Sequence, residues 1–180
     1  MTRFRSLVVA AGLALVAALP VAAQAEATLK ETEQAIAALK KADPGLSKFF
    51  AKAAGYAVFP NIGKGGFIVG GAGGSGYLFE GGKAIGTTTM AQATVGAQIG
   101  GQTYVEVVFF ETKEALAAFK KGEWTMAAQA SAVVVKSGAS ADAKYKDGIA
   151  VFTLPKAGAM AEASIGGQKF TYTPNGAKKK

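Results

Sequence analysis

Apolar and polar positions follow a helical period in the first part of the chain and a strand period after it. Residues 28–54 predict two helices. Thr28 with Glu31 three residues later forms a capping-box pattern, and Asp43-Pro44 suits the start of the second helix. The second helix carries an apolar stripe at i, i+3, i+4, i+7 and i+8, which consists of Leu46, Phe49, Phe50, Ala53 and Ala54.

Glycine interrupts the strand period unusually often. Fifteen of the 24 glycines lie between Gly55 and Gly101, in a stretch that is too apolar and aromatic for a disordered glycine tract. This composition predicts strands that bend sharply, bulge or let another backbone come close. The elements expected here are a strand at 56–59 ended by Pro60-Asn61, strands at 66–69 and 77–80 around a glycine-rich turn, and a Gly81-Gly82 hairpin.

The remaining pattern completes an α+β fold. Residues 103–111 give the strongest strand, and 112–121 predict a helix capped by Thr112, whereas 123–135 are ambiguous between helix and strand. The other expected elements are a bent strand pair at 87–99, a turn at Asp147-Gly148, and strands at 149–154, 159–165 and 169–173. The predicted fold is a compact, strongly bent antiparallel β-sheet, barrel- or sandwich-like, with N-terminal helices and one central helix packed against it.

The first 25 residues have the pattern of a secretory signal peptide. Arg3 and Arg5 give a basic start, an apolar run of about 13 residues follows, and Ala23-Gln24-Ala25 is a small-residue cleavage site. The run is short for a membrane span of roughly 20 residues. We therefore expect cleavage after Ala25 and a periplasmic or secreted protein. It would consist of one domain at 26–174 and a disordered basic tail at 175–180, with no transmembrane helix and no lipid-modified cysteine.

Charge and composition exclude several classes of function. The formal net charge of +8 falls to +6 without Arg3 and Arg5, and Lys178–Lys180 hold three of these charges. The remaining cations are all Lys, so we expect no nucleic-acid partner, since such proteins usually carry a strong basic face with Arg. With neither His nor Cys, the chain lacks Ser-His and Cys-His catalysis and ordinary zinc or copper sites. We expect no enzyme activity, no metal and no cofactor.

A few residues could contribute to binding, and each also has a purely structural interpretation. Lys48 and Lys52 lie on one flank of the second helix, either as lysines whose stems cover the core or as the rim of a membrane contact. Lys64 is either a solvated loop lysine or a cation for an anionic headgroup. Glu106, inside an apolar strand, is either a partly buried carboxylate satisfied by Lys or backbone donors, or a polar group in a ligand cavity.

Three segments together resemble the SYLF lipid-binding domain family. The first is Gly55-Tyr-Ala-Val-Phe-Pro-Asn-Ile-Gly-Lys-Gly-Gly-Phe67, the glycine-rich opening. The second is Gly96-Ala-Gln-Ile-Gly-Gly-Gln102 followed by Glu106-Val-Val-Phe-Phe110, and the third runs from Asp147-Gly-Ile-Ala-Val-Phe152 to Ile165-Gly-Gly167. The resemblance spans about residues 46–172, and it rests on the order and spacing of the three segments.

The resemblance implies a non-catalytic, exported protein that contacts anionic phospholipid headgroups or a membrane surface. Eukaryotic members bind phosphoinositides through a basic N-terminal helix and some bind actin. The helix at 28–41 here has mixed charge, so neither phosphoinositide specificity nor an actin partner is expected. The candidate lipid-binding residues are Lys48, Lys52, Lys64, Phe67 and Lys156, with Glu106 as a structural polar residue. The alternative is a structural or interaction protein of the cell envelope without a lipid ligand, and the oligomeric state stays open.

Overall fold

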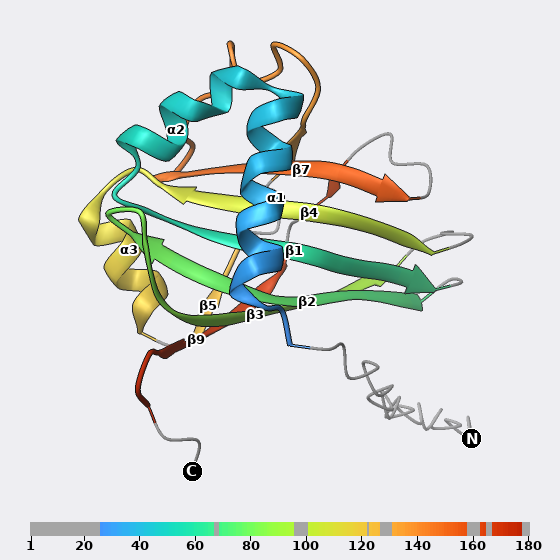
Figure 1. The fold of residues 1–180 in the computed structure, drawn as a ribbon. Coiled ribbons are helices and arrows are strands. Elements are labelled where there is room, and N and C mark those ends of the chain that lie inside the picture. Colours follow the sequence, from blue (N-terminus) through green and yellow to red (C-terminus); the bar gives the residue numbers. More distant parts are fainter. Residues whose placement is uncertain are drawn as a thin grey trace, which may run out of the picture.

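The computed structural model shows a curled sheet with helices packed on it (Figure 1). The described residues are 26–66, 69–95, 101–121, 123–126, 131–157, 163–164 and 167–177. The predicted signal peptide, Phe67 and most of the strand expected at 159–165 lie outside the described residues.

Capping residues define where the helices begin, as the sequence predicts. The Thr28 hydroxyl accepts a hydrogen bond from the Glu31 amide at 3.2 Å, and the Glu31 carboxylate accepts one from the Thr28 amide at 2.8 Å. The Thr112 hydroxyl accepts from the Ala115 amide in the same way. The described helices are α1 (Leu29–Ala42), the 3-10 helix η1 (Pro44–Leu46), α2 (Ser47–Lys52) and α3 (Lys113–Lys120).

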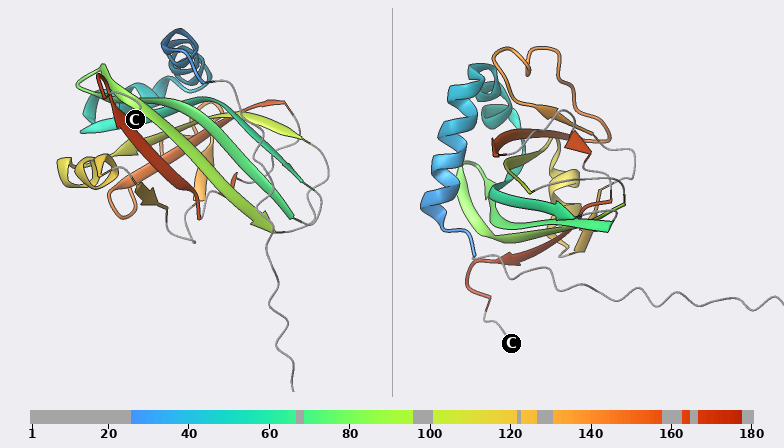
Figure 2. Two further views of the ribbon diagram at one scale, coloured as in Figure 1. Left: turned by 90° about the horizontal axis from the view of Figure 1, so that it is seen from below. Right: turned by 90° about the vertical axis from the view of Figure 1, so that its right-hand side faces the viewer.

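The described strands form one sheet in the order β5-β9-β3-β2-β1-β4-β7-β6-β8. Their bounds are β1 Gly55–Gly66, β2 Val69–Glu80, β3 Lys83–Val95, β4 Gln102–Phe110, β5 Glu123–Thr125, β6 Ser131–Val134, β7 Ile149–Ala157, β8 Ala163–Ser164 and β9 Lys169–Pro174. The sheet curls strongly, so that α1 lies outside the curve and α3 lies at one end of it (Figure 2). The predicted α+β architecture with a bent sheet is confirmed.

The prediction of a wholly antiparallel sheet is wrong at one place, because β6 pairs with β7 in parallel. The ambiguous residues 123–135 supply β5 and β6 rather than a helix. The strand pair expected at 87–99 is part of the single strand β3 as far as it is described. Beyond β9, Asn175 donates from its side chain to the carbonyl of Ala84 at 2.8 Å.

Two predicted breaks in the strands are absent. β1 continues through Pro60 and Asn61, and its registers with β2 and β4 both shift there. A bulge of this kind leaves residues out of the ladder, so a proline without an N–H is tolerated. The glycine-rich segment 70–76 is likewise no turn, because it lies inside β2 and pairs along its length with β3.

The glycines of this segment allow neighbouring backbones to approach closely. A Cβ on Gly76 would lie 2.0 Å from the carbonyl oxygen of Val58, and one on Gly74 would lie 2.7 Å from that of Asn61. No real Cβ atom sits so close to a backbone oxygen, so only glycine fits. At the β2–β3 hairpin, Gly81 and Gly82 have φ of +57° and +77°, which confirms the predicted two-residue turn.

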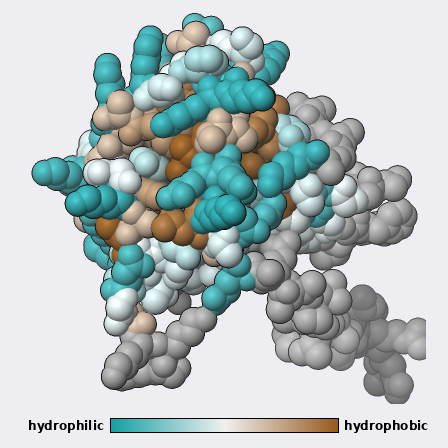
Figure 3. All heavy atoms as spheres, in the orientation of Figure 1, coloured by the Kyte–Doolittle hydropathy of each residue, from teal (hydrophilic) through white to brown (hydrophobic). Residues whose placement is uncertain are grey.

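Each face of the curled sheet has its own apolar core. The inner face packs around Phe59, Tyr104, Phe110 and Phe170 and includes Phe119 of α3. The outer core lies beneath α1 and α2 and contains Leu39, Leu46, Tyr56, Phe109 and Phe152. In Figure 3, which has the orientation of Figure 1, hydrophilic side chains project in front of an apolar layer.

Asp43 ties the start of η1 to a distant loop, and we expect Asp43→Ala to destabilise the protein. Its carboxylate accepts from the Gly45 amide at 3.0 Å and from the Ser140 amide at 2.7 Å. Burial alone would raise the pKa of Asp43, but hydrogen bonds from Ser140 and Gly45 outweigh it and lower the pKa. The variant should lose about 1–3 kcal/mol in urea unfolding at pH 7. This loss should shrink as the pH falls through the lowered pKa.

Exposed Asp142→Ala is the matched control, and it should leave the unfolding midpoint unchanged. An Asp43→Ala protein as stable as wild type at pH 7 would show that the two hydrogen bonds contribute nothing net.

Candidate functional site

The inner face of the sheet grades from apolar to polar along its length. Successive inward residues of β4 are Phe110, Val108, Glu106 and Tyr104, since side chains alternate along a strand. Leu116 and Phe119 of α3 cover the Phe110 end. The opposite end carries the cross-strand row formed by Gln92, Ala72, Lys64 and Gln102, which are register partners on β3, β2, β1 and β4. The polar inner residues therefore lie away from α3.

Glu106 is fully buried in the middle of this inner face. Its partner is the side chain of Gln168, whose Nε2 donates to Glu106 Oε2 at 3.0 Å. The structural interpretation expected Lys or backbone donors to Glu106, whereas the donor in the structure is the side-chain amide of Gln168. Gln168 comes just before β9, and its backbone carbonyl accepts from the amide of Met126 at the end of β5. The side-chain bond therefore links β4 to the β5–β9 end of the sheet.

The buried Glu106–Gln168 pair has one hydrogen bond, and the second oxygen of each side chain has no donor. Glu106 Oε1 and Gln168 Oε1 have no hydrogen-bond partner among the described residues, and the same holds for Oγ1 of Thr153, the register partner of Glu106 on β7. Burial raises the pKa of Glu106 to about 7, and the Gln168 hydrogen bond opposes this only in part. A proton on Glu106 Oε1 could be donated to Gln168 Oε1, which would satisfy both oxygens in a reciprocal acid–amide pair.

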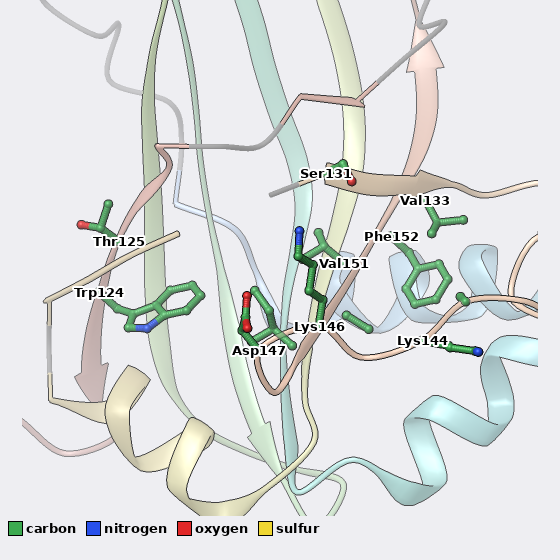
Figure 4. Close-up of a pocket in the computed structure, with 12 residues that line it drawn as sticks. Trp124, Thr125, Ser131, Val133, Lys144, Lys146, Asp147, Val151 and Phe152 are labelled. Atoms are coloured by element: carbon green, nitrogen blue, oxygen red, sulfur yellow. The ribbon is translucent and has the colours of Figure 1, made fainter. Parts of the chain in front are cut away.

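A pocket of about 400 Å³ lies between the two ends of the curled sheet, and we call it the seam pocket. Figure 4 places Trp124 and Thr125 of β5 on one side and Ser131, Val133 and Phe152 of β6 and β7 on the other. The remaining lining residues are Ala143, Lys144, Lys146, Asp147, Ile149, Ala150 and Val151. The pocket exists because β5 pairs with β9 and not with β6 or β7.

Apolar walls and exposed charges meet in the seam pocket. The side chains of Trp124, Val133 and Val151 supply apolar surface, and Lys146 extends through the middle of the view in Figure 4. The position of Lys146 is fixed by the predicted Asp147-Gly148 turn, because Lys146 and Ile149 exchange backbone hydrogen bonds of 2.8 and 3.0 Å across it. Lys144 and Lys146 are both exposed. Asp147 also lines the pocket and is exposed, so two lysines and one carboxylate leave a net charge of +1, which together with the apolar walls suits an aliphatic group with an anionic end.

The structure does not bring the predicted lysines together. Lys48 and Lys52 are exposed on α2, next to the start of β1, whereas Lys64 lies near the far end of β1 (Figure 1). Lys156 is exposed and its Nζ donates to Asn61 Oδ1 at 2.6 Å. Lys64 is no loop residue, because only 7% of it is exposed and it lies within β1. Phe67 lies outside the described residues.

The aromatic neighbours of Lys48 and Lys52 belong to the core rather than to a contact surface. Phe49 packs on Phe109 and Phe152 with ring centroids 5.5 and 4.9 Å apart, and Phe50 packs on Tyr56 and Phe109. Lys48 instead lines a second hollow of about 380 Å³ together with Asp43 and Phe49.

Sequence reasoning missed Lys144 and Lys146. Their signal is the pair of lysines immediately before the Asp147-Gly148 turn, which sets them at the mouth of a hairpin. That turn was predicted, but the end of the sheet that it faces was not. None of the helices in the described part of the chain has the length and hydropathy of a membrane span.

Comparison with known proteins gives two similarities. Residues 91–178 match the family model described as Ysc84, Las17-binding protein actin regulator. A protein of Aeromonas veronii named beta cell expansion factor A is 30% identical over 141 residues, which cover 77% of this chain and 53% of that protein. The chain therefore spans about half the length of this curated relative. The matched residues 91–178 include all the residues that line the seam pocket.

Proposed function

Because the chain belongs to the Ysc84 (SYLF) domain family, which residues 91–178 match, we propose that it binds anionic phospholipid without catalysis and that the seam pocket is the binding site. The family recognised from the sequence motifs is confirmed. Membership favours a lipid-binding or membrane-associated role. The finer claims, namely the headgroup charge, the site and export through the predicted signal peptide, are proposals.

The seam pocket is the observation that carries this proposal. Its volume of about 400 Å³ suits a segment of one acyl chain or a glycerol backbone with its phosphate, and most ligand sites measure roughly 300–1,000 Å³. Burial of aliphatic groups contributes roughly 0.8 kcal/mol per CH₂. Each lysine held near an anionic surface adds about 1 kcal/mol, so Lys144 and Lys146 would make the affinity depend on salt.

The other exposed candidate lysines do not line the seam pocket and would be separate points of contact with a membrane surface. Lys48 and Lys52 on α2 face solvent and can approach a headgroup region, whereas the exposed Lys156 would first have to release its hydrogen bond to Asn61. The family description names actin regulation, which is said of the proteins behind that description. Our proposal includes no actin, since α1 carries acidic as well as basic residues. Co-sedimentation with actin filaments would test that expectation directly.

We expect the full chain to co-sediment with phosphatidylglycerol vesicles more than with phosphatidylcholine vesicles, and the difference should shrink as salt rises. The Lys144→Glu/Lys146→Glu double variant should bind anionic vesicles at least tenfold more weakly, since two attractions become repulsions. The matched control is Lys30→Glu/Lys83→Glu, which reverses two exposed lysines of α1 and β3, neither of which lines the pocket. Val151→Trp should also weaken binding by filling the pocket.

Two results would contradict the proposal. If the Lys144/Lys146 variant and the control lose affinity equally, the pocket is not the site. If wild type binds neither vesicle, the envelope interaction role without a lipid ligand becomes the better description.

A further inference from the structure

The turn that follows β9 holds the sequence Asn175-Gly176, and both residues are exposed. Asn175 attaches this turn to β3 through two hydrogen bonds. Its backbone amide donates to the carbonyl of Ile85 at 3.0 Å, and its side-chain Nδ2 donates to the carbonyl of Ala84 at 2.8 Å. The carboxamide of Asn175 is therefore part of what holds the chain end on the sheet.

The backbone nitrogen of Gly176 can reach the side chain of Asn175. Attack of this nitrogen on Asn175 Cγ closes a ring of five atoms. The two backbone hydrogen bonds of the turn start from the amides of Asn175 and Ala177, so neither of them holds the Gly176 amide. Gly176 has a φ of +84°, and a Cβ built on it would meet nothing within 4 Å. The nitrogen thus has no side chain beside it and open space around it.

The other asparagine of the sequence, Asn61, has different surroundings. It lies within β1, and the residue after it is the fully buried Ile62. Its Oδ1 accepts a hydrogen bond from Lys156 Nζ at 2.6 Å. A β-branched side chain crowds its own backbone nitrogen and stiffens the residue. Asn61 is therefore an internal control for the reactivity of Asn175.

We propose that Asn175 is a modification site, at which attack by the Gly176 nitrogen converts the asparagine and detaches the chain end from β3. The new bond joins the Gly176 nitrogen to Asn175 Cγ, and the Cγ–Nδ2 bond breaks with ammonia as the leaving group. Water then opens the resulting succinimide at either carbonyl, which gives aspartate or isoaspartate. The net reaction consumes one water and releases one ammonia, without oxidation or reduction.

Either product loses the side-chain anchor. A carboxylate has no N–H to donate, so its charged oxygens would face the Ala84 carbonyl oxygen without a proton between them. Isoaspartate also adds one methylene to the main chain. The new negative charge lies close in sequence to Lys178–Lys180, and it lowers the formal net charge of the chain by one. None of the residues in this turn lines the seam pocket, so the proposal stands apart from the proposed lipid site.

The test incubates the full chain at 37 °C and pH 8 and follows its peptides by mass spectrometry. The peptide with Asn175 should gain about 1 Da, because OH replaces NH₂, and should separate into an aspartate and an isoaspartate form. Conversion should be at least about tenfold faster than at Asn61, since glycine leaves the attacking nitrogen unhindered. It should also be faster than at pH 6, because the attacking nitrogen must lose its proton.

Two variants check the chemistry. Gly176→Ile gives Asn175 the same following residue that Asn61 has, and it should slow the conversion at least about tenfold. Asn175→Gln should show no mass gain over the same time, because its longer side chain would have to close a less favourable ring of six atoms. A synthetic peptide with the sequence of residues 171–177 is the positive control.

Hydrogen exchange measures the loss of the anchor. In Asn175→Asp, the backbone amide of residue 175 should exchange at least about fivefold faster than in fresh wild-type protein, and the Val107 amide in β4 should be unchanged. The modification site is overturned if Asn175 and Asn61 convert equally, or if Asn175 stays intact while the synthetic peptide converts. Unchanged exchange at residue 175 would overturn the detachment.

Discussion

Replacing Gly76 with alanine is expected to prevent the sheet from folding, with a loss of more than about 4 kcal/mol in the free energy of unfolding. The added Cβ would lie 2.0 Å from the carbonyl oxygen of Val58 and 2.8 Å from its carbonyl carbon. Both atoms are backbone in the adjacent strand β1, so no side-chain rotation relieves the contact. β1 and β2 would have to separate at the point where the sheet curls, and both lie in the middle of the sheet.

Gly65→Ala provides the matched control. Gly65 lies in the same pair of strands, and a Cβ there would meet nothing within 4 Å. A compatible glycine-to-alanine change commonly stabilises by about 0.4–1 kcal/mol, because it reduces the freedom of the unfolded chain. Circular dichroism and thermal melting compare the two proteins. A Gly76→Ala protein that melts within a few degrees of wild type would show that the strands can separate without loss.

The same glycines explain which parts of the fold the sequence could predict. Helix starts were predictable because capping is local, as at Thr28 and Thr112. The sequence predicts a turn for the run from Gly70 to Gly76, because a turn and a sharply curled strand favour the same residue. Only the approach of the Val58 and Asn61 carbonyls distinguishes them, and those residues belong to another strand. The sequence likewise predicts a strand end at Pro60, because the bulge that accommodates this proline depends on both neighbouring strands.

For the candidate sites, the sequence likewise predicted some residues but not the partners that surround them in the fold. Glu106 and Lys64 were recognisable as charged residues among apolar or glycine neighbours. The neighbours of these two residues could not be predicted from the sequence. The partner of Glu106 lies 62 residues away, and the row around Lys64 combines four strands. The seam pocket is the feature that the local sequence indicates least. It follows from the failure of β5 to meet β6 and β7, which is a property of the whole sheet.

Glu106→Gln should remove a pH dependence from the stability of the protein. Glu106 is fully buried, and burial raises its pKa from 4.5 to about 7. The folded state therefore binds a proton more tightly than the unfolded state. This contribution to stability is complete below pH 4.5 and is lost as the pH rises through about 7. Its full size is about 3 kcal/mol, since one pKa unit corresponds to about 1.4 kcal/mol.

Glutamine imitates the protonated carboxyl at every pH. Its Nε2 can donate to Gln168 Oε1 while its Oε1 accepts from Gln168 Nε2, so the reciprocal pair that neutral Glu106 would form is kept. The variant should match wild type within about 1 kcal/mol at pH 4 and exceed it by about 3 kcal/mol at pH 8. Other groups titrate alike in both proteins, so the difference between the two unfolding curves isolates Glu106.

Urea unfolding of the two proteins from pH 4 to pH 8 measures this difference, with exposed Glu33→Gln as the matched control. The free energy of unfolding of the control should change with pH in the same way as that of wild type. A Glu106→Gln curve that also runs parallel would mean that the carboxylate is stabilised in the folded state by a partner outside the described chain. In that case Glu106 is ionised in the folded state at neutral pH, and its acid–amide pair with Gln168 does not form.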